Sequence, residues 1–139
     1  DFVFMVEVLS LGRAKRPEFQ LLPGTDYMVP AGVIGAMGAF SPLSAVAPKL
    51  VRTIYDLCVK QQFTQARPAQ EDIAELSHRL KAAGLAGLKG ALRAMGRDCG
   101  QPRPPARALG EVEYGKLAED LNAMSFLRAS LCVQLFSTV

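Results

Sequence analysis

Lys89 is the side chain of this sequence that most invites a chemical role. It lies within GLAGLKGALRAMG, a run of small and apolar residues that is typical of a buried helix. A lysine that loses its water can have a depressed pKa and act as an amine nucleophile. The alternative is that its aliphatic stem covers apolar surface while its ammonium group reaches water. We favour the second interpretation.

The other reactive side chains lack the spacing that catalysis or metal binding needs. His78 falls on the polar side of a predicted helix, with no second histidine or cysteine at ligand spacing, so we expect a surface residue. Cys58, Cys99 and Cys132 show no metal-binding pattern, and we interpret each as a small buried or half-buried thiol. Free thiols favour a reducing compartment, the cytoplasm or the mitochondrial matrix. We expect no metal and no cofactor.

The elements that would position any site are predicted around residues 19 to 51. Phe19–Leu22 is a short apolar run before a Pro-Gly pair, as expected of a buried parallel strand. Thr25 is expected to cap a helix over residues 26 to 37, with Asp26 in its first turn, and Ala39–Ser41 is predicted as a second strand. Two strands joined by one helix require a right-handed parallel crossover. We therefore predict a βαβ core.

The same stretch has a rival interpretation as a membrane span. No charged residue occurs between Asp26 and Lys49, which is long enough to cross a bilayer of roughly 20 residues. However, Pro30, Pro42 and Pro48 interrupt the stretch, and a spanning helix tolerates such breaks only beside protein neighbours. We favour the buried core and expect no membrane span.

Helical periodicity accounts for most of the remaining chain. The predicted helices cover residues 2–16, 48–62, 64–83, 85–95 and 111–127, and residues 96–110 form an extended proline-containing loop. Pro68 is expected either to kink its helix or to mark its true start.

Composition indicates a globular chain. Its 139 residues suffice for one domain with a core, half of them are apolar, and the net charge is only +3. The densest basic group, Arg93, Arg97, Arg103 and Arg107, has no aromatic residues alternating with it to stack bases. We therefore expect no binding to nucleic acid.

Three segments in order carry a resemblance to a known family. They are FQLLPGTD, GVIGAMGAFSPLSAVAPKLV and GLAGLKGALRAMGRDCGQPRPP. From Phe19 to about Met124 the chain resembles the C-terminal part of the dihydrodipicolinate synthase and N-acetylneuraminate lyase family, pyruvate-dependent class I aldolases and lyases built on a (β/α)8 barrel. The match is closest to the lyase and 4-hydroxy-2-oxoglutarate aldolase branches.

The resemblance implies chemistry that this chain lacks. In the family, a lysine at the end of the sixth strand forms a Schiff base with pyruvate, a tyrosine relays the proton, and a glycine-threonine-threonine turn holds the carboxylate. The resemblance places residues 2–16 as the sixth helix, just after that lysine. It therefore implies that the chain contains no catalytic residue and is inactive alone.

The expected fold class is α/β: the C-terminal fragment of a (β/α)8 TIM barrel, with its last two strands and C-terminal helices, mostly helical by residue count. A complete barrel takes roughly 250 residues. Two parallel strands keep unpaired edges and cannot close one. We expect residues 1–124 to form this partial domain and residues 125–139 to form an atypical apolar tail.

The resemblance also implies substrate-binding residues. Gly24 and Asp26 match the turn after the seventh strand, which in lyases contacts the hydroxylated tail of the substrate. Tyr27 stands where lyases have glutamate, and Ser41 lies beside the lyase serine position, which is Pro42 here. Both departures weigh against a sialic-acid substrate. Alternatively, Gly24 serves only a tight turn and Asp26 only the start of the helix.

Two function classes follow. The first is a fragment of a Schiff-base-forming aldolase or lyase that acts on small 2-oxo acids, with a homo-oligomeric parent enzyme. The alternative is a catalytically inactive helical module that associates with another chain. An unrelated small helical domain is a third interpretation.

Overall fold

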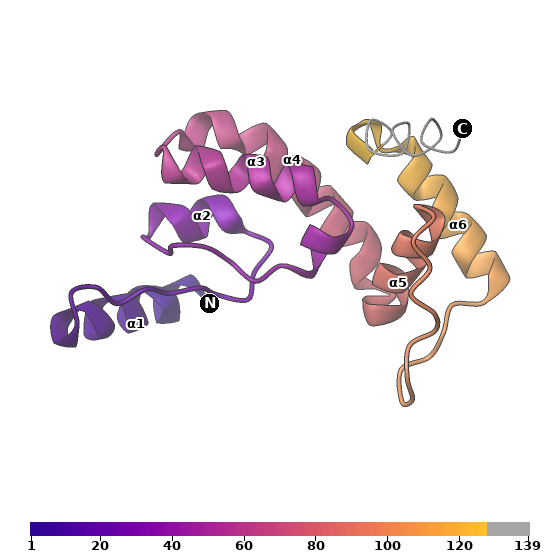
Figure 1. Ribbon diagram of the computed structural model, residues 1–139, viewed down its shortest axis with the longest axis horizontal. Helices are drawn as coiled ribbons and strands as arrows, with labels where there is room; N and C mark the ends of the chain where they lie inside the picture. Colours follow the sequence, from indigo (N-terminus) through magenta and orange to yellow (C-terminus); the bar gives the residue numbers. More distant parts are fainter. Residues whose placement is uncertain (128–139) are drawn as a thin grey trace. The chain divides into compact units, whose positions relative to one another are not determined.

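The computed structural model describes residues 1–127, and these residues are mostly helical (Figure 1). The elements are α1 (Phe2–Lys15), α2 (Met28–Val33), the 3-10 helix η1 (Pro42–Ala45), α3 (Pro48–Val59), α4 (Phe63–Lys81), α5 (Gly84–Ala94) and α6 (Glu111–Ala123). Within this part of the chain, every helix is too short or too polar to span a bilayer. The six predicted α-helices all occur in the predicted order, with ends that differ by a few residues.

The contacts divide the chain into two compact units. The first holds residues 1–44 and 49–74, and the second holds residues 45–48 and the described residues from 75 onward. The proposed boundary between a domain over residues 1–124 and a tail over 125–139 stays a prediction, because residues 128–139 lie outside the described part of the chain.

The two predicted strands do not form regular strands. Phe19–Leu22 and Ala39–Ser41 carry no strand assignment, and their neighbourhood holds one isolated parallel bridge between Gly24 and Phe40. Phe40 N–H donates to the Pro23 carbonyl (2.9 Å), and Thr25 N–H donates to the Phe40 carbonyl (3.1 Å). The parallel direction is thus confirmed, but the strands are wrong.

The physical reason is that a parallel strand is stabilised by neighbours on both edges. Here the two segments meet each other along one edge, and the described residues supply no other strand. Pro23 also has no N–H group to donate to a ladder.

The helix between these segments is shorter than predicted, and Thr25 is not its N-cap. The N-cap of α2 is Tyr27, whose own N–H donates to Thr25 Oγ1 (3.0 Å). The helix ends at Val33 because Gly35 follows with φ of +96°, a left-handed conformation that an α-helix cannot contain.

Helix α3 and the part of α4 up to residue 74 complete the first unit. Ile54 of α3, and Ala66 and Ile73 of α4, are fully buried. Pro68 does not mark the start of α4, because this helix begins at Phe63 and runs through the proline. The missing proline N–H removes only one intrahelical hydrogen bond, which a helix with a buried face tolerates.

Helices α5 and α6 pack together in the second unit. A Cβ atom added at Gly90 would lie 2.8 Å from Leu109 Cδ1 and 3.0 Å from Leu117 Cδ2, so the small residue permits the close packing. The guanidinium of Arg93 lies 4.1 Å from the ring centre of Tyr114, a favourable cation–π contact. These contacts explain why α5 is rich in glycine and alanine.

The reactive side chains mostly lie where the sequence predicts. Lys89 Nζ donates a 2.7 Å hydrogen bond to the Cys99 carbonyl at an exposed position, and His78 is exposed. Cys58 is half-buried, as expected, but Cys99 is exposed, because it lies in the loop after α5. Cys132 lies outside the described residues.

Candidate substrate-binding site

Two turns meet beside the parallel bridge and form the candidate site. The first is Gly24-Thr25-Asp26, which leads into α2, and the second is Phe40-Ser41-Pro42, which leads into η1. Together these six residues line a hollow of about 540 Å³. The three residues singled out from the sequence, Gly24, Asp26 and Ser41, therefore lie together.

Ser41 is the centre of the hydrogen bonding in this site. It is 9% exposed, and its hydroxyl donates to Oδ1 of Asp26 (2.6 Å). The same hydroxyl oxygen accepts the Leu43 N–H (3.2 Å), and the Ser41 carbonyl accepts the Ser44 hydroxyl (2.7 Å). Ser41 therefore joins the two turns and orients the Asp26 carboxylate.

Gly24 is exposed, and its surroundings are open. A Cβ atom there would meet nothing within 4 Å, and its φ lies outside the left-handed region that favours glycine. A tight turn therefore does not explain this glycine. The open space leaves room for a ligand to approach the backbone.

Gln70 of α4 holds the first turn from the other side, and sequence reasoning missed it. Its Nε2 donates to the Asp26 carbonyl (2.8 Å), and its Oε1 accepts the Val29 N–H (3.0 Å). The partners are 44 and 41 residues away along the chain. No local pattern around Gln70 signals such contacts.

One aromatic side chain lines the site, and a second follows Asp26 in the sequence. Phe40 lines the hollow and is 71% exposed, and Tyr27, next to Asp26, is 56% exposed. The site thus offers a carboxylate and open backbone beside apolar surface. Such a mixture is suited to a small ligand that has both hydroxyl groups and carbon surface.

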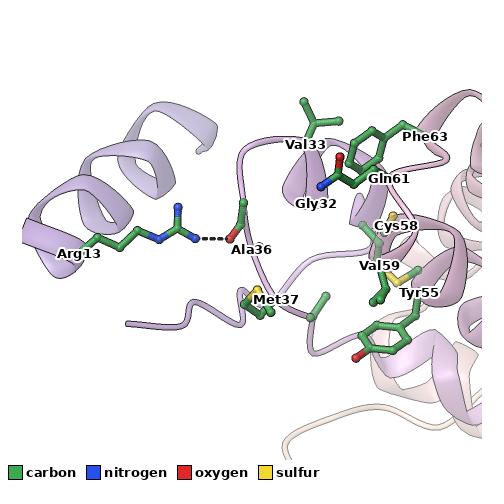
Figure 2. A pocket seen from close by; sticks show the side chains of 14 residues that line it. Arg13, Gly32, Val33, Ala36, Met37, Tyr55, Cys58, Val59, Gln61 and Phe63 are labelled. Carbon is green, nitrogen blue, oxygen red and sulfur yellow. Dashed lines mark hydrogen bonds between the residues drawn. The ribbon is translucent and has the colours of Figure 1, made fainter. Parts of the chain in front are cut away.

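A second hollow, of about 520 Å³, lies between α2 and α3 and is mostly apolar (Figure 2). Arg13 reaches it from α1 and donates to the Gly35 carbonyl (2.8 Å). Cys58 also lines it, and burial raises the pKa of this thiol, which keeps it protonated and weakly nucleophilic at neutral pH. This hollow contains none of the predicted site residues.

Neither hollow offers a nucleophilic amine or a metal site. No lysine lines either of them. Over residues 1–127, no three histidine, cysteine or carboxylate side chains gather into a group that could hold a metal ion. The residues that line the candidate site thus carry a carboxylate, hydroxyl groups and open backbone, but no amine that could form a Schiff base.

The parallel bridge, the helices that follow each segment and the site beside the bridge define a piece of a parallel α/β enzyme fold. The sequence pattern of the dihydrodipicolinate synthetase family matches residues 5–124. The chain belongs to this family, and the resemblance noted from the sequence is confirmed. Lyase and aldolase chemistry by way of a pyruvate Schiff base, on a TIM barrel, fits that family.

Individual relatives agree. The chain is 33% identical over 125 residues to an uncharacterized DapA-like lyase of Halobacterium salinarum, covering 87% of this chain and 41% of the relative. It is 28% identical over 130 residues to the 4-hydroxy-tetrahydrodipicolinate synthase of Archaeoglobus fulgidus, covering 87% of this chain and 43% of that enzyme. The chain thus spans less than half the length of these relatives.

Solved structures show the same fold. Dihydrodipicolinate synthase of Bacteroides thetaiotaomicron aligns with a TM-score of 0.78 at 22% identity, covering 88% of this chain and 43% of that chain. N-acetylneuraminate lyase of Fusobacterium nucleatum, solved with pyruvate, aligns with a TM-score of 0.76 at 23% identity, covering 90% and 42%. The chain therefore has the fold of part of this TIM barrel.

Proposed function

We propose that this chain is the C-terminal, substrate-binding portion of a Schiff-base-forming aldolase or lyase for 2-oxo acids, and that the catalytic lysine lies outside it. The observation that carries the proposal is the meeting of Gly24, Asp26 and Ser41 in one hollow that no lysine lines. The family supplies the reaction class, and the share of the relatives that the chain covers supports the status of a fragment.

The division of labour follows from the chemistry of the reaction. A lysine amine attacks the 2-oxo carbon and water leaves, so that a protonated imine can accept the electron pair of a breaking carbon–carbon bond. The part of the substrate beyond that bond carries hydroxyl groups, which carboxylate and backbone groups can bind. Asp26 and the open backbone at Gly24 suit this second task.

Reductive trapping tests the absence of a catalyst. The purified chain is incubated with pyruvate and sodium borohydride, and intact mass spectrometry then looks for a covalent adduct. We expect none, whereas a complete family enzyme treated in parallel acquires one. An adduct on this chain would overturn the proposal, and peptide mapping would show whether Lys89 carries it.

The substrate-binding role is tested separately. We expect 2-keto-3-deoxygluconate, a hydroxylated 2-oxo acid, to shift the amide NMR resonances of Gly24, Asp26 and Ser41 in the ¹⁵N-labelled chain. Asp26→Asn should weaken this binding, and Glu18→Gln, at an exposed position outside the hollow, should leave it unchanged. Resonance shifts confined to the second hollow would contradict the proposed site.

The alternative function, a binding module without catalysis, is favoured by one observation. Leu22, Met37 and Phe40, close to the unpaired segments, are 47%, 53% and 71% exposed. Apolar side chains beside open parallel edges are suited to further strands of a barrel. Sedimentation tests whether the chain binds such a partner. The chain is measured alone and then mixed with the part of the Archaeoglobus enzyme that it does not match. A stable heterodimer is expected, and two independent species would count against it.

A further inference from the structure

Helix α2 lacks the usual means of satisfying its first N–H groups. It has only six residues, and its N-cap Tyr27 provides no side-chain hydrogen bond. Its third residue, Pro30, has no N–H group at all. The Val29 N–H is therefore left to a partner from elsewhere, and that partner is the side-chain oxygen of Gln70 (3.0 Å).

The same carboxamide makes a second hydrogen bond, to the carbonyl of Asp26 (2.8 Å). One donor and one acceptor are needed at adjacent points of the turn, and a glutamine side chain carries both without a charge. These partners fix the orientation of the carboxamide. Its oxygen must face the Val29 N–H, and its NH₂ group must face the Asp26 carbonyl. Gln70 is half-buried, so water competes weakly for these bonds.

Hydrogen bonds consequently hold both the main chain and the side chain of Asp26. Gln70 holds its main-chain carbonyl, and Ser41 holds its carboxylate (2.6 Å). The backbone anchor comes from α4, which is remote in sequence from both turns. Without it, the turn would lose a hydrogen bond to its main chain from outside the two turns.

We infer that Gln70 is a positioning residue for substrate binding: its carboxamide holds the Gly24–Asp26 turn in the orientation that presents Asp26 to the ligand. This inference rests on the proposed function of that turn. Gln70 itself does not line the hollow, so it acts through Asp26.

The test uses this 139-residue chain, labelled with ¹⁵N, and three variants of it. Gln70→Ala removes both hydrogen bonds. Gln70→Glu keeps the acceptor for Val29 but places a charged oxygen against the Asp26 carbonyl. Gln65→Ala is the matched control, because Gln65 lies on the same helix with an exposed side chain.

The first readout is the turn itself. We expect Gln70→Ala to shift the amide resonances of Gly24 and Asp26 and to speed hydrogen exchange at Val29, while Gln65→Ala changes neither. In Gln70→Glu, the turn resonances should return toward the wild-type positions as the pH falls and the glutamate gains a proton, because the protonated carboxyl can again donate. The wild-type chain, titrated in parallel, accounts for Asp26, the acidic side chain of the turn.

The second readout is the affinity for 2-keto-3-deoxygluconate, measured by titration of the same spectra. Loss of the anchoring hydrogen bonds should weaken binding by roughly 3- to 10-fold in Gln70→Ala. A recovery of the turn resonances in Gln70→Glu at low pH would trace their shift to the lost donor to the Asp26 carbonyl.

The outcomes separate the two proposals. If Asp26→Asn weakens binding but Gln70→Ala does not, the site stands and the positioning role is wrong. If Gln70→Ala leaves the turn resonances and Val29 exchange unchanged, the positioning role is also wrong. If Asp26→Asn has no effect, or the wild-type chain does not bind the probe, the proposed site fails and the positioning role fails with it.

Discussion

The hydroxyl of Ser41 donates a 2.6 Å hydrogen bond to Oδ1 of Asp26, and the whole of α2 lies in the sequence between them. This bond closes the loop formed by the two parallel segments and their connecting helix. It also joins two of the residues that line the hollow. If the proposed site binds a ligand, this contact should therefore affect both ligand binding and local stability.

Removal of that hydroxyl should be costly. Ser41→Ala deletes the donor to Asp26 and the acceptor for the Leu43 N–H at a buried position. We expect the free energy of unfolding to fall by about 1–2 kcal/mol in urea titrations followed by circular dichroism. Ser10→Ala, at an exposed position on α1, should change it by less than about 0.5 kcal/mol. Equal effects of the two substitutions would show that the Ser41 hydrogen bonds contribute nothing.

The start of α6 should respond to acid. The side-chain bonds from Arg107 (2.6 and 2.8 Å), with the Gly110 N–H (2.8 Å), lower the pKa of Glu113 to about 2. Because this pKa is lowered in the folded state, the ionised carboxylate stabilises the helix above the ordinary glutamate pKa. That contribution is lost as the pH falls through about 2.

The side-chain carboxyl resonance of Glu113 in ¹³C NMR measures this directly. Arg107→Ala should raise the pKa of Glu113 toward its ordinary value, although the Gly110 bond remains. Arg103→Ala, at an exposed position in the same loop, should not move it. A Glu113 pKa near the ordinary value in the unmodified chain would refute the ion pair.

Two glycines, Gly87 on α5 and Gly115 on α6, should respond in opposite ways to substitution by alanine. A Cβ atom at Gly87 would lie 2.9 Å from Ala83 Cβ and 3.0 Å from the backbone oxygen of Leu80, so Gly87→Ala should destabilise the chain by about 1–3 kcal/mol. A Cβ atom at Gly115 of α6 would meet nothing within 4 Å, so Gly115→Ala should stabilise it by about 1 kcal/mol. Urea unfolding of both variants checks the opposite signs, and the same sign for both would contradict the packing.

The two described cysteines should differ in reactivity. Burial raises the pKa of the Cys58 thiol, and the thiolate is the form that reacts, whereas Cys99 is exposed. We expect iodoacetamide to modify Cys99 faster than Cys58 in the native chain, with peptide mapping to separate them from Cys132. The difference should vanish in concentrated urea. Equal native rates would show that Cys58 is not shielded.

Helix positions could be predicted from sequence because their signals are local. Pro17 follows α1, Pro48 opens α3, and the small residues of α5 predict a buried helix wherever it packs. The family was also recognisable, since its three segments occur in order. The two strands were predicted wrongly from sequence, because a parallel strand needs partners across the chain, and here each segment has one partner on one edge.

The candidate site divides in the same way. Gly24, Asp26 and Ser41 could be named from motifs, but their meeting in one hollow depends on the parallel bridge. Gln70 could not be named at all. Its amide forms hydrogen bonds with a turn more than forty residues away. Nothing in the local sequence distinguishes this glutamine from other helical glutamines.

The order of residues was thus enough to establish the family and to place the helices, because family motifs and helical periodicity are local features of the chain. Folding was needed to show which polar groups share a site and which side chain anchors it. Hydrogen bonds between distant segments require donor and acceptor to be placed to within a fraction of an ångström. That placement exists only after the helices have packed.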